Sequence, residues 1–87
     1  MIVSNMRSAK GNDVPNQFTI ESKDGRTFQS YKSVIATVKD GKVTLDEVYW
    51  NHSRTTSKYL SIFLNSSTLE TKNRIKDGTY TLANLNP

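Results

Sequence analysis

Alternating hydrophobic and polar positions mark the first half of the chain as β-structure. Phe18 and Ile20 alternate with polar neighbours, and residues 31–38 place two valines and an alanine on one face. A period of two is typical of half-buried strands. Asp-Gly pairs at 24–25 and 40–41 predict hairpins, because both residue types tolerate a positive φ. The pattern therefore predicts an antiparallel meander.

Weaker strand patterns occur elsewhere. Residues 27–29 and 43–45 read as the return strands after the two Asp-Gly turns, and Ile2 and Val3 could open a first strand. Residues 79–82 could form a last strand in which Tyr80 and Leu82 point inward.

A helical pattern replaces the alternation in the second half of the chain. Ser53 or Thr55 can cap a helix with its side-chain oxygen. Residues 67–70 have the S-x-x-E spacing of a capping box, which predicts a second short helix to about Lys76, ended by Gly78. Four large side chains share one face of the first helix: Tyr59, Leu60, Phe63 and Leu64.

These elements fit one small domain. The chain has 87 residues, which suffice for a single modest core. Residues 8–16 are rich in turn formers and are expected to be a loop, and residues 83–87 are expected to be a loose tail. We therefore expect residues 1–87 to form an α+β domain, an antiparallel β-meander of four or five strands with two short helices packed on one face.

Composition limits the cellular location, the kinds of site and the partners that we expect for this chain. The chain contains no Cys, so it has neither a disulfide framework nor a thiolate metal site. The sequence has no signal-peptide pattern and no apolar run long enough to span a bilayer, so we expect a soluble cytoplasmic protein with no membrane partner. The net charge of +4 favours nucleic acid or an acidic protein surface, although a solvated surface explains it more simply.

Catalytic signatures are missing from the sequence. His52 is the only imidazole, and its neighbour Ser53 is better explained as a helix cap than as a nucleophile. Asp46 and Glu47 are adjacent, so on a strand they point to opposite faces and read as charges at a sheet edge. The glycines are scattered and form no phosphate-binding motif. We expect no enzyme activity, no metal and no cofactor.

The junction between the two patterns gathers the side chains best suited to a partner. Arg54 and Lys58 stand four apart near the expected start of the first helix, where like charges repel and a cation is unfavourable. This arrangement hints at an acidic partner. The candidate partner-binding residues are Tyr49, Trp50, His52, Arg54, Thr56 and Lys58.

Nucleic acid is an alternative partner, because basic and aromatic residues interleave as they do in proteins that bind single strands. Arg26, Lys32 and Lys42 are the further candidate contacts with nucleic acid. The simpler explanation is that most rings, including Phe28, Trp50, Tyr59 and Phe63, form the core.

Segments spread over nearly the full length carry a family resemblance. Examples are Ile2-Val3-Ser4-Asn5-Met6-Arg7-Ser8, Val14-Pro15-Asn16-Gln17-Phe18 and Gly78-Thr79-Tyr80-Thr81-Leu82. The chain resembles a family of short, largely uncharacterised bacteriophage and prophage proteins. The resemblance implies a small accessory protein of a mobile element and supplies no functional residues. Such proteins commonly bind and block a host defence or replication component, or coat nucleic acid.

Two functions are therefore expected. The first is a non-enzymatic phage accessory protein that binds and blocks a host protein or ribonucleoprotein, such as a CRISPR nuclease. Its positive charge argues against a DNA mimic, which would be acidic. The alternative is a small basic DNA- or RNA-binding protein.

Overall fold

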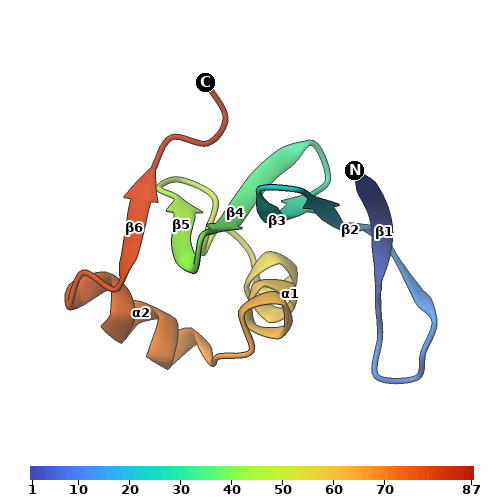
Figure 1. Cartoon of the computed structure of the whole chain (residues 1–87). Coiled ribbons are helices and arrows are strands. Elements are labelled where there is room, and N and C mark those ends of the chain that lie inside the picture. Colours follow the sequence, from blue (N-terminus) through green and yellow to red (C-terminus); the bar gives the residue numbers. More distant parts are fainter.

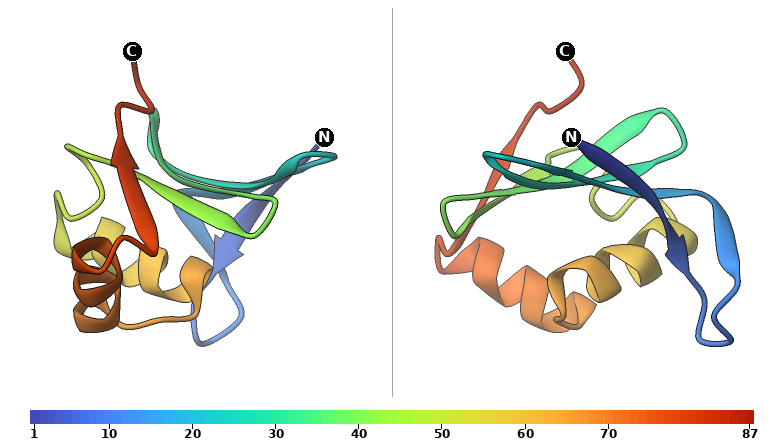
Figure 2. Two further views of the ribbon diagram at one scale, coloured as in Figure 1. Left: turned by 60° about the vertical axis from the view of Figure 1, so that its left-hand side comes forward. Right: turned by 45° about the vertical axis from the view of Figure 1, so that its right-hand side comes forward.

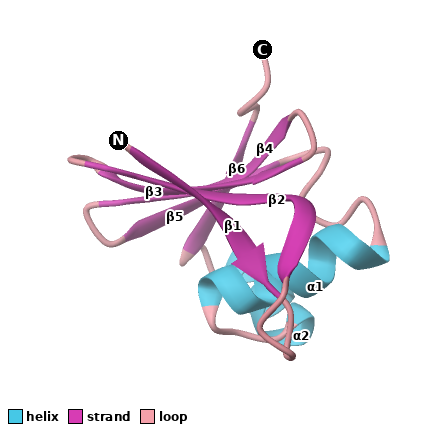
Figure 3. Ribbon diagram, turned by 90° about the vertical axis from the view of Figure 1, so that its right-hand side faces the viewer, coloured by secondary structure: helices cyan, strands magenta, loops and turns pink.

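A computed structural model describes all residues from Met1 to Pro87 and confirms the α+β class. Six strands form one sheet in chain order, and two helices lie on one of its faces (Figures 1 and 3). The expected count of four or five strands is wrong, since residues 2–7 and 80–83 both join the sheet. The strands are β1 (Ile2–Arg7), β2 (Asp13–Ser22), β3 (Gly25–Ser30), β4 (Ser33–Lys39), β5 (Lys42–Asp46) and β6 (Tyr80–Ala83), and the helices are α1 (Arg54–Leu64) and α2 (Thr68–Lys76).

The sheet is antiparallel from β1 to β5, but β6 pairs with β5 in parallel. Both helices lie in the connection between β5 and β6, which returns the chain to the end where β5 begins. A parallel pair needs such a long crossover. The prediction of a purely antiparallel meander is therefore wrong for the last strand.

Both predicted Asp-Gly hairpins are confirmed. Asp40 and Gly41 have φ of 51° and 75°, the left-handed pair that a tight hairpin requires. Gly25 has a different reason to be glycine: a Cβ built there would lie 1.9 Å from the carbonyl oxygen of Val38 on β4. The backbone of β3 approaches β4 too closely for any side chain at this position.

The expected loop at residues 8–16 is shorter than predicted, because β2 already begins at Asp13. The Arg7 guanidinium lies 3.8 Å from the Asp13 carboxylate across the hairpin. Pro15 is tolerated in this strand because pairing with β3 starts only at Gln17, so the missing N–H breaks no bond there. The hairpin of β1 and β2 bends toward the helix-bearing side of the sheet (Figure 2).

A β-bulge interrupts the alternation in β4. Phe28 pairs with Ala36 and Gln29 pairs with Val34, so Ile35 is the extra residue. Ile35 and Ala36 are consequently both buried, although strict alternation predicted opposite faces. The strand also begins at Ser33, two residues later than expected, because Tyr31 lies in a turn.

The core lies between the sheet and the two helices. Phe28 on β3 stacks on Phe63 of α1, with ring centroids 5.7 Å apart. Phe28, Tyr59 and Phe63 are buried, which confirms that these rings are core, and Trp50 packs against them while partly exposed. Leu82 is 40% exposed, so the expectation that it points inward is wrong.

Asp46, expected as a charge at a sheet edge, is instead a buried structural carboxylate that is 1% exposed. Its oxygens accept hydrogen bonds from the backbone N–H groups of Val48 (3.1 Å), Tyr49 (2.8 Å) and Leu85 (2.8 Å), and from Asn86 Nδ2 (3.0 Å). Burial by itself would raise the pKa of this carboxyl. The four donors outweigh burial and hold the pKa below its ordinary value.

The C-terminal tail is docked rather than loose. Asn86 Oδ1 accepts from the Val34 N–H at 2.7 Å, and Asn86 Nδ2 donates to the Val34 carbonyl at 2.8 Å. The tail therefore acts as a local partner for the backbone at the start of β4. Neither helix has the length and apolar character that crossing a membrane requires.

Candidate functional site

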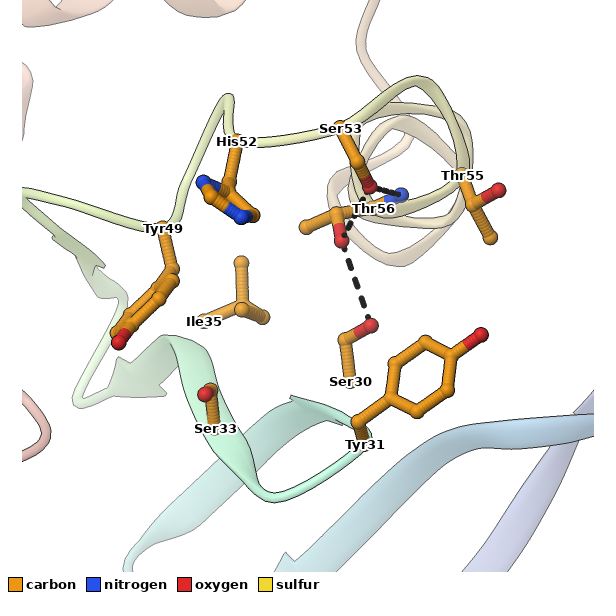
Figure 4. A pocket seen from close by; sticks show the side chains of 9 residues that line it. All are labelled: Ser30, Tyr31, Ser33, Ile35, Tyr49, His52, Ser53, Thr55 and Thr56. Atoms are coloured by element: carbon orange, nitrogen blue, oxygen red, sulfur yellow. Dashed lines mark hydrogen bonds between the residues drawn. The ribbon is translucent and has the colours of Figure 1, made fainter.

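A hollow of about 480 Å³ opens where the turn between β3 and β4 meets the segment that leads into α1 (Figure 4). Its volume lies in the range of small-ligand and side-chain pockets. The lining residues come from two distant parts of the chain: Ser30, Tyr31, Ser33 and Ile35 from the sheet, and Tyr49, His52, Ser53, Thr55 and Thr56 from the helix side.

The start of α1 is fixed by hydroxyl groups. Ser53 is the N-cap, as predicted, and its Oγ accepts from the Thr56 N–H at 3.1 Å. The Ser53 hydroxyl also donates to Thr56 Oγ1 at 3.0 Å, and Thr56 Oγ1 lies 3.3 Å from Ser30 Oγ on β3. This chain of hydroxyls ties the helix to the sheet and holds two walls of the hollow in place.

Tyr31 stands at the rim in an unusual backbone conformation. Its φ is 56°, in the left-handed region that bulky residues rarely adopt, and the residue is 60% exposed. The Tyr31 N–H donates to the Asn16 carbonyl at 2.7 Å, and Gln29 Nε2 donates to the Tyr31 carbonyl at 2.8 Å. The surrounding backbone thus holds the ring at the edge of the hollow.

Tyr49 and His52 form the opposite wall. Their rings meet edge to face, with centroids 5.5 Å apart. The Tyr49 backbone is anchored by Asp46, and the His52 N–H donates to the Tyr49 carbonyl at 3.2 Å. Ile35, the extra residue of the β4 bulge, lies between the Tyr31 and Tyr49 walls (Figure 4).

The hollow brings together only part of the predicted surface. Tyr49, His52 and Thr56 line it. Trp50 does not line the hollow and lies instead beside residues of α1 and α2. Lys58 Nζ lies 5.5 Å from the centroid of the Tyr59 ring and does not line the hollow.

Two cations flank the hollow without a carboxylate partner. Lys32 lies between two lining residues in sequence, and Arg54 lies between two others. Both are exposed, and the two ion pairs of the structure involve other residues: Arg7 with Asp13, and Arg74 with Glu70. No acidic side chain lines the hollow, and the charged residues next to its lining in sequence are these two cations.

The remaining predicted contacts lie at the other end of the sheet. Arg26 pairs with Val38 near the start of β3, and its guanidinium stacks 4.8 Å above the Phe63 ring. Lys42 opens β5 at the same end. At ~3.3 Å per residue, Arg26 is roughly 13 Å along β3 from Ser30. The structure therefore does not join Lys32 and Lys42 into one basic track.

Sequence reasoning missed the sheet half of this site. Ser30, Ser33 and Ile35 reach the hollow through the β4 bulge and the β3–β4 turn, which no local pattern announced. Tyr31 was expected inside a strand. Ser30 stands directly before it and Ser33 follows two positions later, and the sequence there gave no signal for a left-handed tyrosine.

The lining of the hollow offers rings, hydroxyls and an apolar side chain for non-covalent contact. The His52 ring makes no hydrogen bond to a hydroxyl or carboxylate, and the structure holds no cluster of three His, Cys, Asp or Glu residues that could bind a metal. Rings, hydroxyls and a short apolar floor can instead seat a side chain of a partner.

Comparison with known proteins gives one match. No curated protein matches the chain, and no solved structure does. A family of unknown function, DUF8033, matches over residues 1–79, so the chain belongs to that family.

Proposed function

We propose that this is a non-enzymatic accessory protein of a bacteriophage or prophage that binds and blocks a macromolecule in the cytoplasm of its bacterial host. A defence nuclease such as that of a CRISPR system is the target we expect. The observation that carries the proposal is the hollow at the start of α1, which is lined by the exposed Tyr31 and the half-buried Tyr49 and has the unpaired cations Lys32 and Arg54 next to its lining residues in sequence. The bacteriophage setting rests on the sequence resemblance.

A rigid surface supports binding by contact. The hollow is framed by hydrogen-bonded backbone on one side and by a capped helix on the other, so little conformational freedom is lost when a partner binds. Tyr and Arg are among the residues that dominate binding energy at protein interfaces. Tyr31, Tyr49 and Arg54 supply these types at one place.

The alternative, a small basic DNA- or RNA-binding protein, has less support. Proteins that bind single strands place cations along a groove that follows the phosphate backbone. Here Arg26 and Lys42 lie at the far end of the sheet from Lys32 and Arg54. A nucleic-acid strand would have to cross the molecule to reach both groups.

Reversing the charge of the helix start tests the proposal. The double change Arg54→Glu and Lys58→Glu should weaken binding to the host macromolecule by at least about tenfold, because the positive charge on the first turns of α1 becomes negative. Both side chains are exposed and make no ion pair, so the fold should survive. The measurement is capture from host lysate, before and after nuclease treatment, followed by titration of the purified target.

The chain offers a matched control. Lys72 and Lys76 are exposed on α2 with the same spacing, so Lys72→Glu with Lys76→Glu changes the net charge equally at another site. This control should leave target binding unchanged. Equal losses from both double variants would contradict the site. Loss of capture after nuclease treatment would favour the nucleic-acid alternative.

A further inference from the structure

We propose that the hollow receives an aromatic side chain from an acidic segment of the partner protein, with the Tyr31 ring as its principal contact. This inference rests on the proposed function and names the partner chemistry of the same site. It follows from three properties of the hollow: a strained tyrosine at its rim, an apolar floor, and a lining without carboxylates that has two unpaired cations beside it in sequence.

The conformation of Tyr31 is the first observation. A side chain with a Cβ is disfavoured in the left-handed region, where glycine or asparagine would be accommodated more easily. Tyr31 nevertheless adopts a φ of 56° and leaves 60% of its surface exposed. The ring is therefore held out to solvent at a cost in stability, and residues in such conformations cluster at binding sites.

The lining is the second observation. Tyr31 and Tyr49 stand on opposite sides with Ile35 between them, and both rings extend outward from it (Figure 4), so an entering side chain would meet an aliphatic floor with an aromatic residue at either edge. An aromatic ring gains most there, because edge-to-face and offset contacts add to burial. The hydroxyls of Ser33 and Thr55 lie at the lining, where they can bond the partner's backbone.

The charged residues next to the hollow in sequence favour an acidic segment of the partner protein. Lys32 and Arg54 flank the hollow in sequence, neither has an ion-pair partner, and no carboxylate lines the site. Carboxylates beside the aromatic residue of the partner would meet both cations. A nucleotide also combines a ring with negative charge, but it belongs to a polymer whose phosphates need further cations, and those of Arg26 and Lys42 are at the far end of the sheet.

Titration of ¹⁵N-labelled protein with four probes tests the inference. The probes are a short acidic peptide with one central Phe, the same peptide with Ser in place of Phe, a peptide with Lys in place of the acidic residues, and a single-stranded oligonucleotide. Amide signals of Tyr31, Ser33, His52 and Thr55 should shift with the acidic Phe peptide, and its affinity should exceed those of the Ser and Lys peptides by about tenfold.

Variants of Tyr31 separate function from folding. Tyr31→Asn should lose at least about tenfold in affinity for the acidic Phe peptide, while its urea midpoint rises by roughly 0.3 M because the left-handed strain is relieved. Tyr31→Phe should retain binding, because the ring remains. Leu69→Asn alters an exposed apolar residue on α2, away from the hollow, and should change neither affinity nor the shifted signals.

Several results would overturn the inference. They are the absence of shifts at millimolar peptide, equal shifts from the Ser peptide, tighter and salt-sensitive binding of the oligonucleotide at this site, and unchanged affinity in Tyr31→Asn. Failure of the proposed function looks different. Peptide binding at the hollow without capture of any host macromolecule would leave the inference standing, whereas capture that survives Tyr31→Asn would remove the inference and leave the function.

Discussion

Replacing Asp46 with Ala is expected to lower the free energy of unfolding by about 3–5 kcal/mol, because several buried donors lose a charged acceptor at ~1–3 kcal/mol each. The carboxylate joins the end of β5, the segment that leads to α1 and the C-terminal tail. A domain of this size has ~5–10 kcal/mol of stability in all. The Ala variant should therefore be barely folded.

We also expect the Asp46 carboxylate to make the free energy of unfolding depend on pH. The pKa of Asp46 is lowered in the folded state by the donors that surround it, relative to its ordinary value of 3.8. A carboxyl with a depressed folded pKa stabilises the protein above its unfolded pKa, and this stabilisation is lost as the pH falls through the folded pKa. Stability should therefore be constant near neutrality and should decline below about pH 4.

Urea unfolding followed by circular dichroism measures both effects. Glu47→Ala is the matched control, since Glu47 is the exposed neighbour of Asp46 and should tolerate the change. A loss below ~1 kcal/mol in Asp46→Ala would contradict the structural role, because that is the size of one ordinary hydrogen bond. A loss of stability in acid that is as large in Asp46→Ala as in the unchanged protein would contradict it too.

Replacing Gln17 with Met is expected to act in the opposite direction and to raise the free energy of unfolding by about 1–3 kcal/mol. Gln17 is fully buried on β2, and neither Oε1 nor Nε2 of its side chain has a hydrogen-bond partner in the protein. Methionine keeps nearly the same shape and removes the unpaired amide. Gln17→Ala should instead destabilise, because it leaves a cavity.

The next strand supplies a control for this test. Gln29 on β3 donates from Nε2 to the Tyr31 carbonyl, so Gln29→Met removes a bond and should give no gain. Thermal and urea unfolding of Gln17→Met, Gln17→Ala and Gln29→Met compare the three directly. A loss of stability in Gln17→Met would show that the buried amide is paired, as it would be by an ordered water.

Much of the fold could be predicted from local pattern, because the signals were local. Asp24-Gly25 and Asp40-Gly41 fixed two hairpins, and the capping box of Ser67 and Glu70 is formed as its spacing predicted. The parallel pairing of β6 could not be predicted in this way. It depends on how the two helices carry the chain across the sheet, which no short window of sequence specifies.

Residues that act at a distance were misread for the same reason. Asp46 looked like a charge at a sheet edge, and Asn86 looked like part of a loose tail. The fold brings the two side chains together in one hydrogen-bond network, although they are 40 positions apart. The sequence around Asp46 carries no signal for Asn86, and the sequence around Asn86 carries none for Asp46.

The candidate site, too, was predicted only in part from the sequence. Its helix half was found at the junction where strand pattern gives way to helix, and Tyr49, His52 and Thr56 do line the hollow. Trp50 and Lys58 were grouped with them by sequence distance alone, but neither Trp50, in the turn before α1, nor Lys58, on α1, lines the hollow. The sheet half depended on a bulge and a left-handed Tyr31, which only the folded backbone reveals.

The most direct test of the binding surface is photo-cross-linking in the bacterial host. A photoreactive amino acid replaces Thr55, which is exposed and lines the hollow, or replaces Leu69, which is exposed on α2. We predict a covalent adduct with one host macromolecule from position 55 and none from position 69. Equal adducts from both positions, or an adduct from position 69 alone, would contradict the assignment of the hollow as the binding site.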